Sequence, residues 1–208
     1  MLALPSPLSL PETLTGSLRL TPEQFAEFCS ANPDAVLELA ADGSLITMTP
    51  TGGDTGARNS TLAFLLQLAI RSSGLPLKLF DSSTGFRLGD GSVLSPDAAL
   101  VNLARWQALD EVERRSFPPL CPDLVVELAS PSDGTPRGLT ALRRKLTAYQ
   151  ANGARLGWLL IPEQRAVEIW GPLAGPAQSP RRIEPADRLD GAPLFPGLVI
   201  DLEEIWAG

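Results

Sequence analysis

Two long stretches of the chain repeat their hydrophobic residues with the period of a helix. The first, near residues 56–72, stops at Gly74 and carries on one face Leu62, Leu65, Leu66, Ala69 and Ile70. The second follows the loop SPSDGTP, ends at Asn152-Gly153 and carries on one face Leu139, Leu142, Leu146 and Tyr149. Helical spacing that ends at a glycine predicts a long helix in each stretch.

Shorter apolar runs predict strands. DLVVELAS is apolar on both sides of the pleat and is expected at the centre of a sheet, with LGWLLI as a second buried strand and AVEIW as its neighbour. Asp-Gly turns separate strand-like runs in two places, Asp42-Gly43 and Asp90-Gly91. We therefore expect a hairpin over residues 36–48, and an antiparallel meander formed by LPLKLF and TGFRLGDGSVLSPDAALV.

The remaining elements complete a mixed arrangement. Residues 1–20 are rich in proline and serine and are expected to form a loosely ordered lead-in. Thr21 then caps a short helix in TPEQFAEFCSAN, and ARWQALDEVERR also has a helical pattern. The order of elements predicts an α/β fold of the α+β type, in which a mixed sheet is flanked by helices in a single domain of residues 21–208.

Composition limits the chemistry. The 208 residues include no histidine, which excludes Ser-His-Asp and Cys-His catalysis and zinc held by histidine. Cys29 and Cys121 are far apart and predict reduced, packed thiols. Carboxylates, lysine and hydroxyl groups remain, and carboxylates gathered at one place would favour Mg²⁺ or Mn²⁺.

Charge is unevenly distributed. The net charge is −7, but five basic and no acidic residues lie between Gly134 and Pro162. Such a segment is either a solvated helix face or a surface for phosphates, with Arg137, Arg143 and Arg144 as the candidate contacts. No apolar run is long enough to cross a membrane and no secretory signal is evident, so we expect a soluble, cytoplasmic protein.

Two acidic residues occupy polar positions in apolar strand-like runs, Asp97 in SPDAALV and Glu127 in DLVVELAS. A carboxylate that faces a sheet interior is costly unless it is paired, hydrogen-bonded or bound to a cation. On neighbouring strands the two could hold one metal ion; alternatively, each could cap a turn or pair with an arginine. Lys145, on the helix after Glu127, could offset charge beside them or could be a surface residue.

These residues carry a family resemblance. Ser95-Pro96-Asp97, the strand PDLVVELASPSD and the lysine helix ending in NGARLGWLLIP resemble the bacterial putative-endonuclease family within the PD-(D/E)XK, restriction-endonuclease-like superfamily. The stretches PTGGDTGARNS, FDSSTGFRL and LFPGLVIDLEEIW also match its pattern. The resemblance therefore spans nearly the whole chain from the hairpin at residue 36 onward.

The resemblance implies a restriction-endonuclease-like core with Asp97 and Glu127 as ligands of Mg²⁺ or Mn²⁺. The parent superfamily places a lysine two residues after the second acid, where this chain has Ala129. Lys145 is similar to the helix lysine that this family uses instead. Glu38 is either an additional carboxylate of the site or an exposed strand residue. The segment where relatives often have a histidine reads GARNS here.

The resemblance thus implies a metal-dependent endonuclease that hydrolyses phosphodiester bonds in DNA. A second hypothesis is a nucleic-acid-binding module on the same fold whose catalytic site has decayed, because the lysine has left its ancestral position. A third is an interaction protein, such as a homodimer formed through the Trp- and Pro-rich C-terminal segment. Dimerisation and catalysis can coexist.

Overall fold

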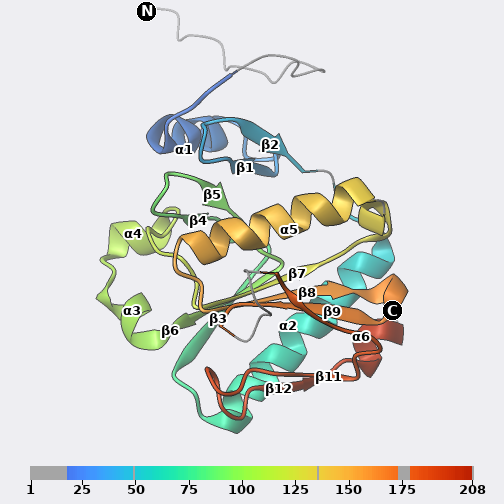
Figure 1. Cartoon of the computed structure of the whole chain (residues 1–208). Coiled ribbons are helices and arrows are strands. Elements are labelled where there is room, and N and C mark those ends of the chain that lie inside the picture. Colours follow the sequence, from blue (N-terminus) through green and yellow to red (C-terminus); the bar gives the residue numbers. More distant parts are fainter. Residues whose placement is uncertain (1–17, 49, 135, 173–178, 208) are drawn as a thin grey trace, which may run out of the picture.

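A six-stranded mixed sheet, in the order β10-β9-β8-β7-β6-β3, forms the centre of this computed structural model, which describes residues 18–48, 50–134, 136–172 and 179–207 (Figure 1). Its strands are β3 (Leu77–Asp81), β6 (Ala98–Asn102), β7 (Leu124–Leu128), β8 (Leu156–Ile161), β9 (Ala166–Trp170) and β10 (Arg181–Ile183). β7 and β8 run parallel, and the other neighbours are antiparallel. Every residue of β7 is buried, which confirms the predicted central strand.

Helices cover both faces of this sheet (Figure 1). On one face lie α2 (Gly53–Ser73) and α6 (Glu203–Ala207), and their apolar residues share a core with alternate residues of the central strands, such as Leu124, Val126 and Trp158. On the other face lies α5 (Pro136–Ala151), whose Leu146 and Tyr149 pack with the remaining strand residues. The predicted mixed sheet flanked by helices is confirmed, and each strand face has its own core.

A second, four-stranded sheet, in the order β2-β1-β5-β4, lies beside the first. Its strands are β1 (Leu37–Leu39), β2 (Leu45–Thr47), β4 (Phe86–Arg87) and β5 (Val93–Leu94). The predicted hairpin is confirmed, and its turn uses Gly43 at φ +83°. The predicted meander is wrong in its pairing, because the β4–β5 hairpin joins β1 while β3 pairs directly with β6. Because β1 pairs with β5, β1 lies next to the segment between β5 and β6.

The helices begin and end at side-chain and glycine caps. α1 (Pro22–Ala31) starts at Thr21, which forms a capping box with Gln24, and α2 ends at Gly74 in the left-handed conformation. ARWQALDEVERR forms two helices, α3 (Leu103–Ala108) and α4 (Glu111–Arg115), because Asp110 caps a new helix. Two 3₁₀ turns, Pro131–Gly134 and Pro162–Gln164, precede α5 and follow β8.

The C-terminal segment packs on the α2 side of the central sheet. It forms β11 (Arg188–Asp190) and β12 (Val199–Asp201) before α6, and its apolar residues belong to the core of the chain itself. The Trp206 indole N–H donates to the Ala186 carbonyl oxygen at 2.7 Å. Most apolar side chains of this segment therefore pack inside the chain, although Val199 on β12 is 38% exposed.

The start of the chain is described only in part. Residues 1–17 of the predicted lead-in lie outside the described residues, whereas Arg19 and Leu20 bond to the β1–β2 turn at Ser44 and Gly43. Cys29 and Cys121 are free thiols, as predicted. Among the described helices, none combines the length and the apolar character that crossing a membrane requires.

Candidate active site

Pairing of β6 with β7 brings the two predicted carboxylates to one end of the central sheet. Ala98 lies opposite Val126 in this antiparallel pair, so Asp97, one residue earlier, comes beside the C-terminal end of β7. Its Oδ2 accepts a 2.7 Å hydrogen bond from the Leu128 backbone N–H. Glu127, only 2% exposed, lies on the sheet face that α5 covers. Of the two alternatives that the sequence left open, the structure therefore has the one in which the two acids lie close together, at neighbouring strands.

Lys145 points from α5 toward these acids. Its ammonium nitrogen lies 3.0 Å from Glu127 Oε1 and 2.8 Å from Glu38 Oε1, and it donates to the Ser95 carbonyl oxygen at 2.6 Å. With its side chain 12% exposed, Lys145 is not the surface charge that was its alternative interpretation. Its three contacts match the three donors of an ammonium group.

Glu38 belongs to the same cluster. It lies on β1 and is 4% exposed, so the interpretation as an exposed strand residue is wrong. Besides Lys145, its Oε1 accepts a 2.7 Å hydrogen bond from the Ser95 backbone N–H. Glu38 therefore binds the backbone that leads into Asp97, and the four-stranded sheet is part of the site.

The cluster of Glu38, Asp97, Glu127 and Lys145 contains three carboxyl groups and one ammonium group, so its buried charges do not balance. Burial raises the pKa of Glu127 to about 8, although the Lys145 ammonium opposes the shift. Burial also raises the pKa of Asp97, against the Leu128 N–H and Lys145. For Lys145, burial acts to lower the pKa, but the carboxylates of Glu127 and Glu38 outweigh it and the net shift is upward. The lysine thus stays protonated, and the carboxylates favour a further proton or cation.

Asn59 is a contact that the sequence reasoning missed. Its side-chain amide donates from Nδ2 to Asp97 Oδ1 at 3.2 Å. Asn59 lies in the GARNS segment on α2, three residues before the buried Leu62 and on the same side of the helix. A polar residue on the apolar face of a predicted helix was the available signal.

A second buried glutamate lies on the same sheet face. Register places Glu127 of β7 opposite Leu159 of β8, and Leu159 opposite Glu168 of β9. Arg143 of α5 binds Glu168 through two hydrogen bonds, of 2.9 Å and 2.6 Å, and Arg182 binds it at 3.3 Å. Helix α5 therefore carries one cation for each buried glutamate.

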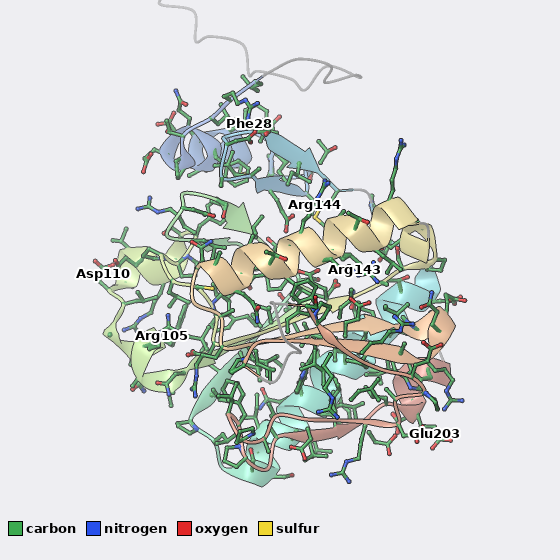
Figure 2. All side chains as sticks on the ribbon, in the orientation of Figure 1. Phe28, Arg105, Asp110, Arg143, Arg144 and Glu203 are labelled. Atoms are coloured by element: carbon green, nitrogen blue, oxygen red, sulfur yellow. The ribbon has the colours of Figure 1, made fainter. Side chains whose placement is uncertain are left out.

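This pairing divides the basic residues predicted to contact phosphate. Figure 2 shows Arg143 on the sheet side of α5 and Arg144 on its other side. Arg137 and Arg144 are exposed, whereas Arg143 is held by Glu168. Arg155 lies beyond the end of α5, with its guanidinium 5.3 Å from the centre of the Phe195 ring. The basic helix therefore covers residues 136–151, and Arg155 lies outside it.

Asp97 and Glu127 have the ligand chemistry that a hard cation prefers, namely carboxylate oxygens. Within the described ranges, no group of three or more His, Cys, Asp or Glu side chains is arranged to hold a metal ion. Asp97 and Glu127 nevertheless supply carboxylate oxygens, and Mg²⁺ is commonly held by one or two carboxylates while it keeps several waters. Asn59 Oδ1 is buried and accepts no hydrogen bond from the described residues, whereas Glu127 Oε1 already lies 3.0 Å from the Lys145 ammonium. The open Asn59 acceptor, next to Asp97, fits a cation at this end of the sheet.

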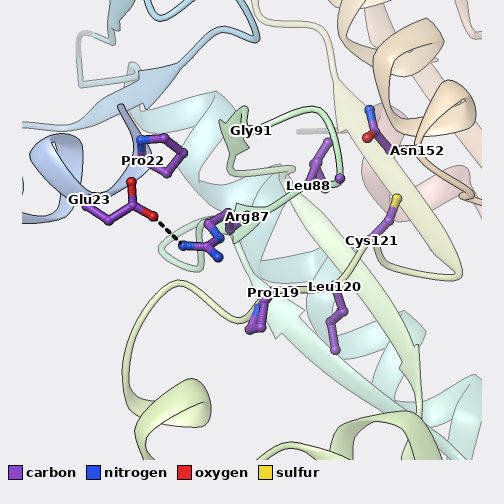
Figure 3. A pocket seen from close by; sticks show the side chains of 10 residues that line it. Pro22, Glu23, Arg87, Leu88, Gly91, Pro119, Leu120, Cys121 and Asn152 are labelled. Carbon is purple, nitrogen blue, oxygen red and sulfur yellow. Dashed lines mark hydrogen bonds and ion pairs between the residues drawn. The ribbon is translucent and has the colours of Figure 1, made fainter. Parts of the chain in front are cut away.

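A separate hollow of about 460 Å³ lies between α1, the β4–β5 turn and the segment before β7 (Figure 3). An ion pair of 3.1 Å between Glu23 and Arg87 crosses it, and Leu88, Leu120 and Cys121 contribute to its wall. None of the carboxylates near Lys145 lines this hollow. The cluster, not the hollow, brings together groups that can do chemistry.

Comparison with known proteins places the chain among nucleases. The model of the family described as Uma2, "Putative restriction endonuclease", matches residues 22–203. Among solved structures, a crystallised protein from Anabaena variabilis ATCC 29413, described as a putative nuclease belonging to DUF820, is similar with a TM-score of 0.69. Sequence identity is 18%, and the alignment covers 90% of this chain and 98% of that one, which shows a shared fold. The search of curated proteins gives no match.

Proposed function

Because the chain belongs to the Uma2 family of restriction-endonuclease-like proteins, we propose that it hydrolyses phosphodiester bonds in DNA with the help of Mg²⁺ or Mn²⁺. A nuclease role follows from the family, and proteins of this superfamily generally use divalent metals. The choice of DNA, the dependence on metal and the roles of individual residues are our proposal.

The observation that carries the proposal is the position of the Lys145 ammonium. The superfamily lysine is absent at residue 129, but Ala129 lies on the same sheet face as Glu127 and is covered by α5. The Lys145 ammonium, 3.0 Å from Glu127, supplies from the helix the positive charge that the strand lacks. A cluster of this charge pattern is costly to bury and is typical of functional sites.

We assign the roles as follows. Asp97 and Glu127 hold the cation, which when bound would stabilise negative charge on the scissile phosphate and lower the pKa of nearby water. Lys145 is protonated, so it acts as a donor to developing negative charge and not as a base. Asn59 and the Leu128 N–H orient the Asp97 carboxylate.

Binding of nucleic acid would use the exposed side of α5. Arg137 and Arg144 are exposed on the helix that carries Lys145, and they can meet phosphates near the site. The proposal leaves Arg143 out of this interface, because its guanidinium is already paired with Glu168.

The test is nicking of supercoiled plasmid in Mn²⁺ by the wild type, Asp97→Asn and Lys145→Met. We expect both variants to lose activity by about 10²-fold or more, since each removes a group that acts on the reacting charges. Glu168→Gln is the matched control, because it changes a buried carboxylate on the same face outside the cluster. Folded Asp97→Asn that nicks like the wild type would assign the activity elsewhere.

The non-catalytic binding module is the second candidate, favoured by the absence of a three-ligand metal cluster in the described part of the chain. Isothermal titration with Mn²⁺ separates the two candidates. A catalytic site binds Mn²⁺ in the wild type and loses that binding in Glu127→Gln. A decayed site shows no Mn²⁺ binding that depends on Glu127.

A further inference from the structure

The outward face of α2 is apolar and uncovered. Phe64 is 63% exposed and Leu68, one turn later, is 50% exposed. The core residues Leu62 and Leu66 lie on the opposite side of the same helix. Neighbouring apolar side chains on an exposed helix face can form part of an interaction surface.

The residues on this face have the spacing of a helix-pairing seam. They follow one another at alternating intervals of three and four positions, as Asp54, Ala57, Thr61, Phe64, Leu68 and Arg71. This interval is the seam of two helices packed along their length. Call this set the α2 seam. Thr61 is half-buried and the other members are exposed.

The α2 seam is complementary to itself when it is reversed. Its first member is acidic, its last is basic, and its middle is apolar or uncharged. In the described part of the chain, neither Asp54 nor Arg71 takes part in an ion pair. Placed antiparallel on a copy of itself, the seam sets Asp54 against Arg71, Ala57 against Leu68 and Thr61 against Phe64, and each pairing occurs twice.

We propose that α2 forms the interface of a homodimer, in which the same helix of a second copy lies antiparallel along the α2 seam. Two-fold symmetry suits a patch that complements itself. Antiparallel helices also place the positive end of each helix dipole near the negative end of the other. The opposite charges at the two ends of the seam favour the antiparallel orientation. A parallel copy would set Asp54 against Asp54 and Arg71 against Arg71.

The dimer is a weak one. A single pair of helices of 21 residues gives an interface at or below the size of standard stable complexes. We therefore expect dissociation in the micromolar range. The proposal does not depend on the nuclease assignment, since Asp97 and Lys145 lie outside the α2 seam.

Sedimentation equilibrium between about 1 and 100 μM tests the interface. The wild type is expected to approach twice the monomer mass of 22.1 kDa as its concentration rises, whereas Phe64→Asp and Leu68→Asp stay monomeric. Val112→Asp is the matched control, because Val112 is 76% exposed on α4 and should leave the mass unchanged. A monomeric wild type, or a dimer insensitive to Phe64→Asp, overturns the proposal.

Charge exchange tests the antiparallel register. Asp54→Arg alone, or Arg71→Asp alone, sets like charges together at both ends and should weaken dimerisation by about 10-fold or more. The double variant restores opposite charges at both ends and should regain wild-type dimerisation. A dimer that Phe64→Asp breaks but that the double variant does not restore contradicts the antiparallel arrangement.

Discussion

Glu127 is the site residue whose ionised form is most strongly disfavoured by burial. Its carboxyl is 2% exposed, and burial holds its pKa near 8, well above the ordinary value of 4.5. The folded protein therefore binds a proton at Glu127 over a pH range in which the unfolded chain has released it. Since the folded state binds more protons, the free energy of unfolding falls as pH rises from about 4.5 to about 8.

Glu127→Gln removes this titration and tests its sign. The melting temperature of metal-free wild type should fall more than that of the variant between about pH 5 and pH 8, so the difference in favour of the variant grows with pH. Lys145 stays protonated in both states across this range because its pKa is raised. Differential scanning calorimetry in EDTA measures the effect, and a constant difference would argue that Glu127 is already ionised at pH 5.

The sequence alone identified the site residues that stand out from their immediate neighbours in the chain. Asp97 and Glu127 interrupt apolar runs, which a reader of the sequence can see. The direction of Lys145 and the burial of Glu38 were not predictable in this way, and the polar position of Asn59 on an apolar helix face did not reveal its contact with Asp97. Each depends on a contact between distant positions, such as the bond of Ser95 to Glu38 across 57 residues. Local pattern contains no information about such contacts.

At the scale of elements, Gly157 decides how closely α5 approaches the sheet. It lies on β8, and a Cβ there would meet Leu146 Cδ2 at 2.9 Å and Trp170 Cβ at 3.3 Å. Leu146 follows Lys145 in sequence. A side chain at residue 157 therefore requires the buried Leu146 side chain to shift, next to the helix turn that carries the site lysine.

Gly157→Val should destabilise the fold by about 1–3 kcal/mol through overpacking and move Lys145 away from Glu127. Urea unfolding monitors the first effect and plasmid nicking the second. Gly56→Val is a matched control on α2, because a Cβ at Gly56 meets nothing within 4 Å. If both variants lost equal stability and equal nicking activity, helix or strand propensity, and not α5 packing, would be the cause of the loss.

Elements were easier to predict than their partners. Apolar period and caps located α2, α5 and β7 because those signals lie within each segment. The β4–β5 hairpin was recognisable from Asp90-Gly91, but its membership in the β1 sheet was not. Register between segments depends on which edges remain free after the chain folds. The same limit explains why ARWQALDEVERR gave one predicted helix, although Asp110 starts a second one.

At the scale of the whole molecule, acidity limits how the protein can hold nucleic acid. The net charge is −7, and several arginines are occupied by acids, among them Arg143 with Glu168 and Arg105 with Asp123. Arg137 and Arg144 remain exposed on α5. If nucleic acid binds along α5 as proposed, we expect only two or three phosphate contacts and weak association.

The salt dependence of binding measures that number directly. Each phosphate contact contributes about −0.9 to the slope of log K against log salt concentration, so we expect a slope of about −2 to −3 for a labelled DNA duplex. Fluorescence anisotropy in EDTA supplies the slope without cleavage. Arg144→Ala should reduce its magnitude by about 0.9. Arg115→Ala should leave the slope unchanged, because that exposed arginine lies on α4 and pairs with Glu111. A slope steeper than about −5 would require cations beyond α5, and would place the phosphate-binding surface elsewhere on the molecule.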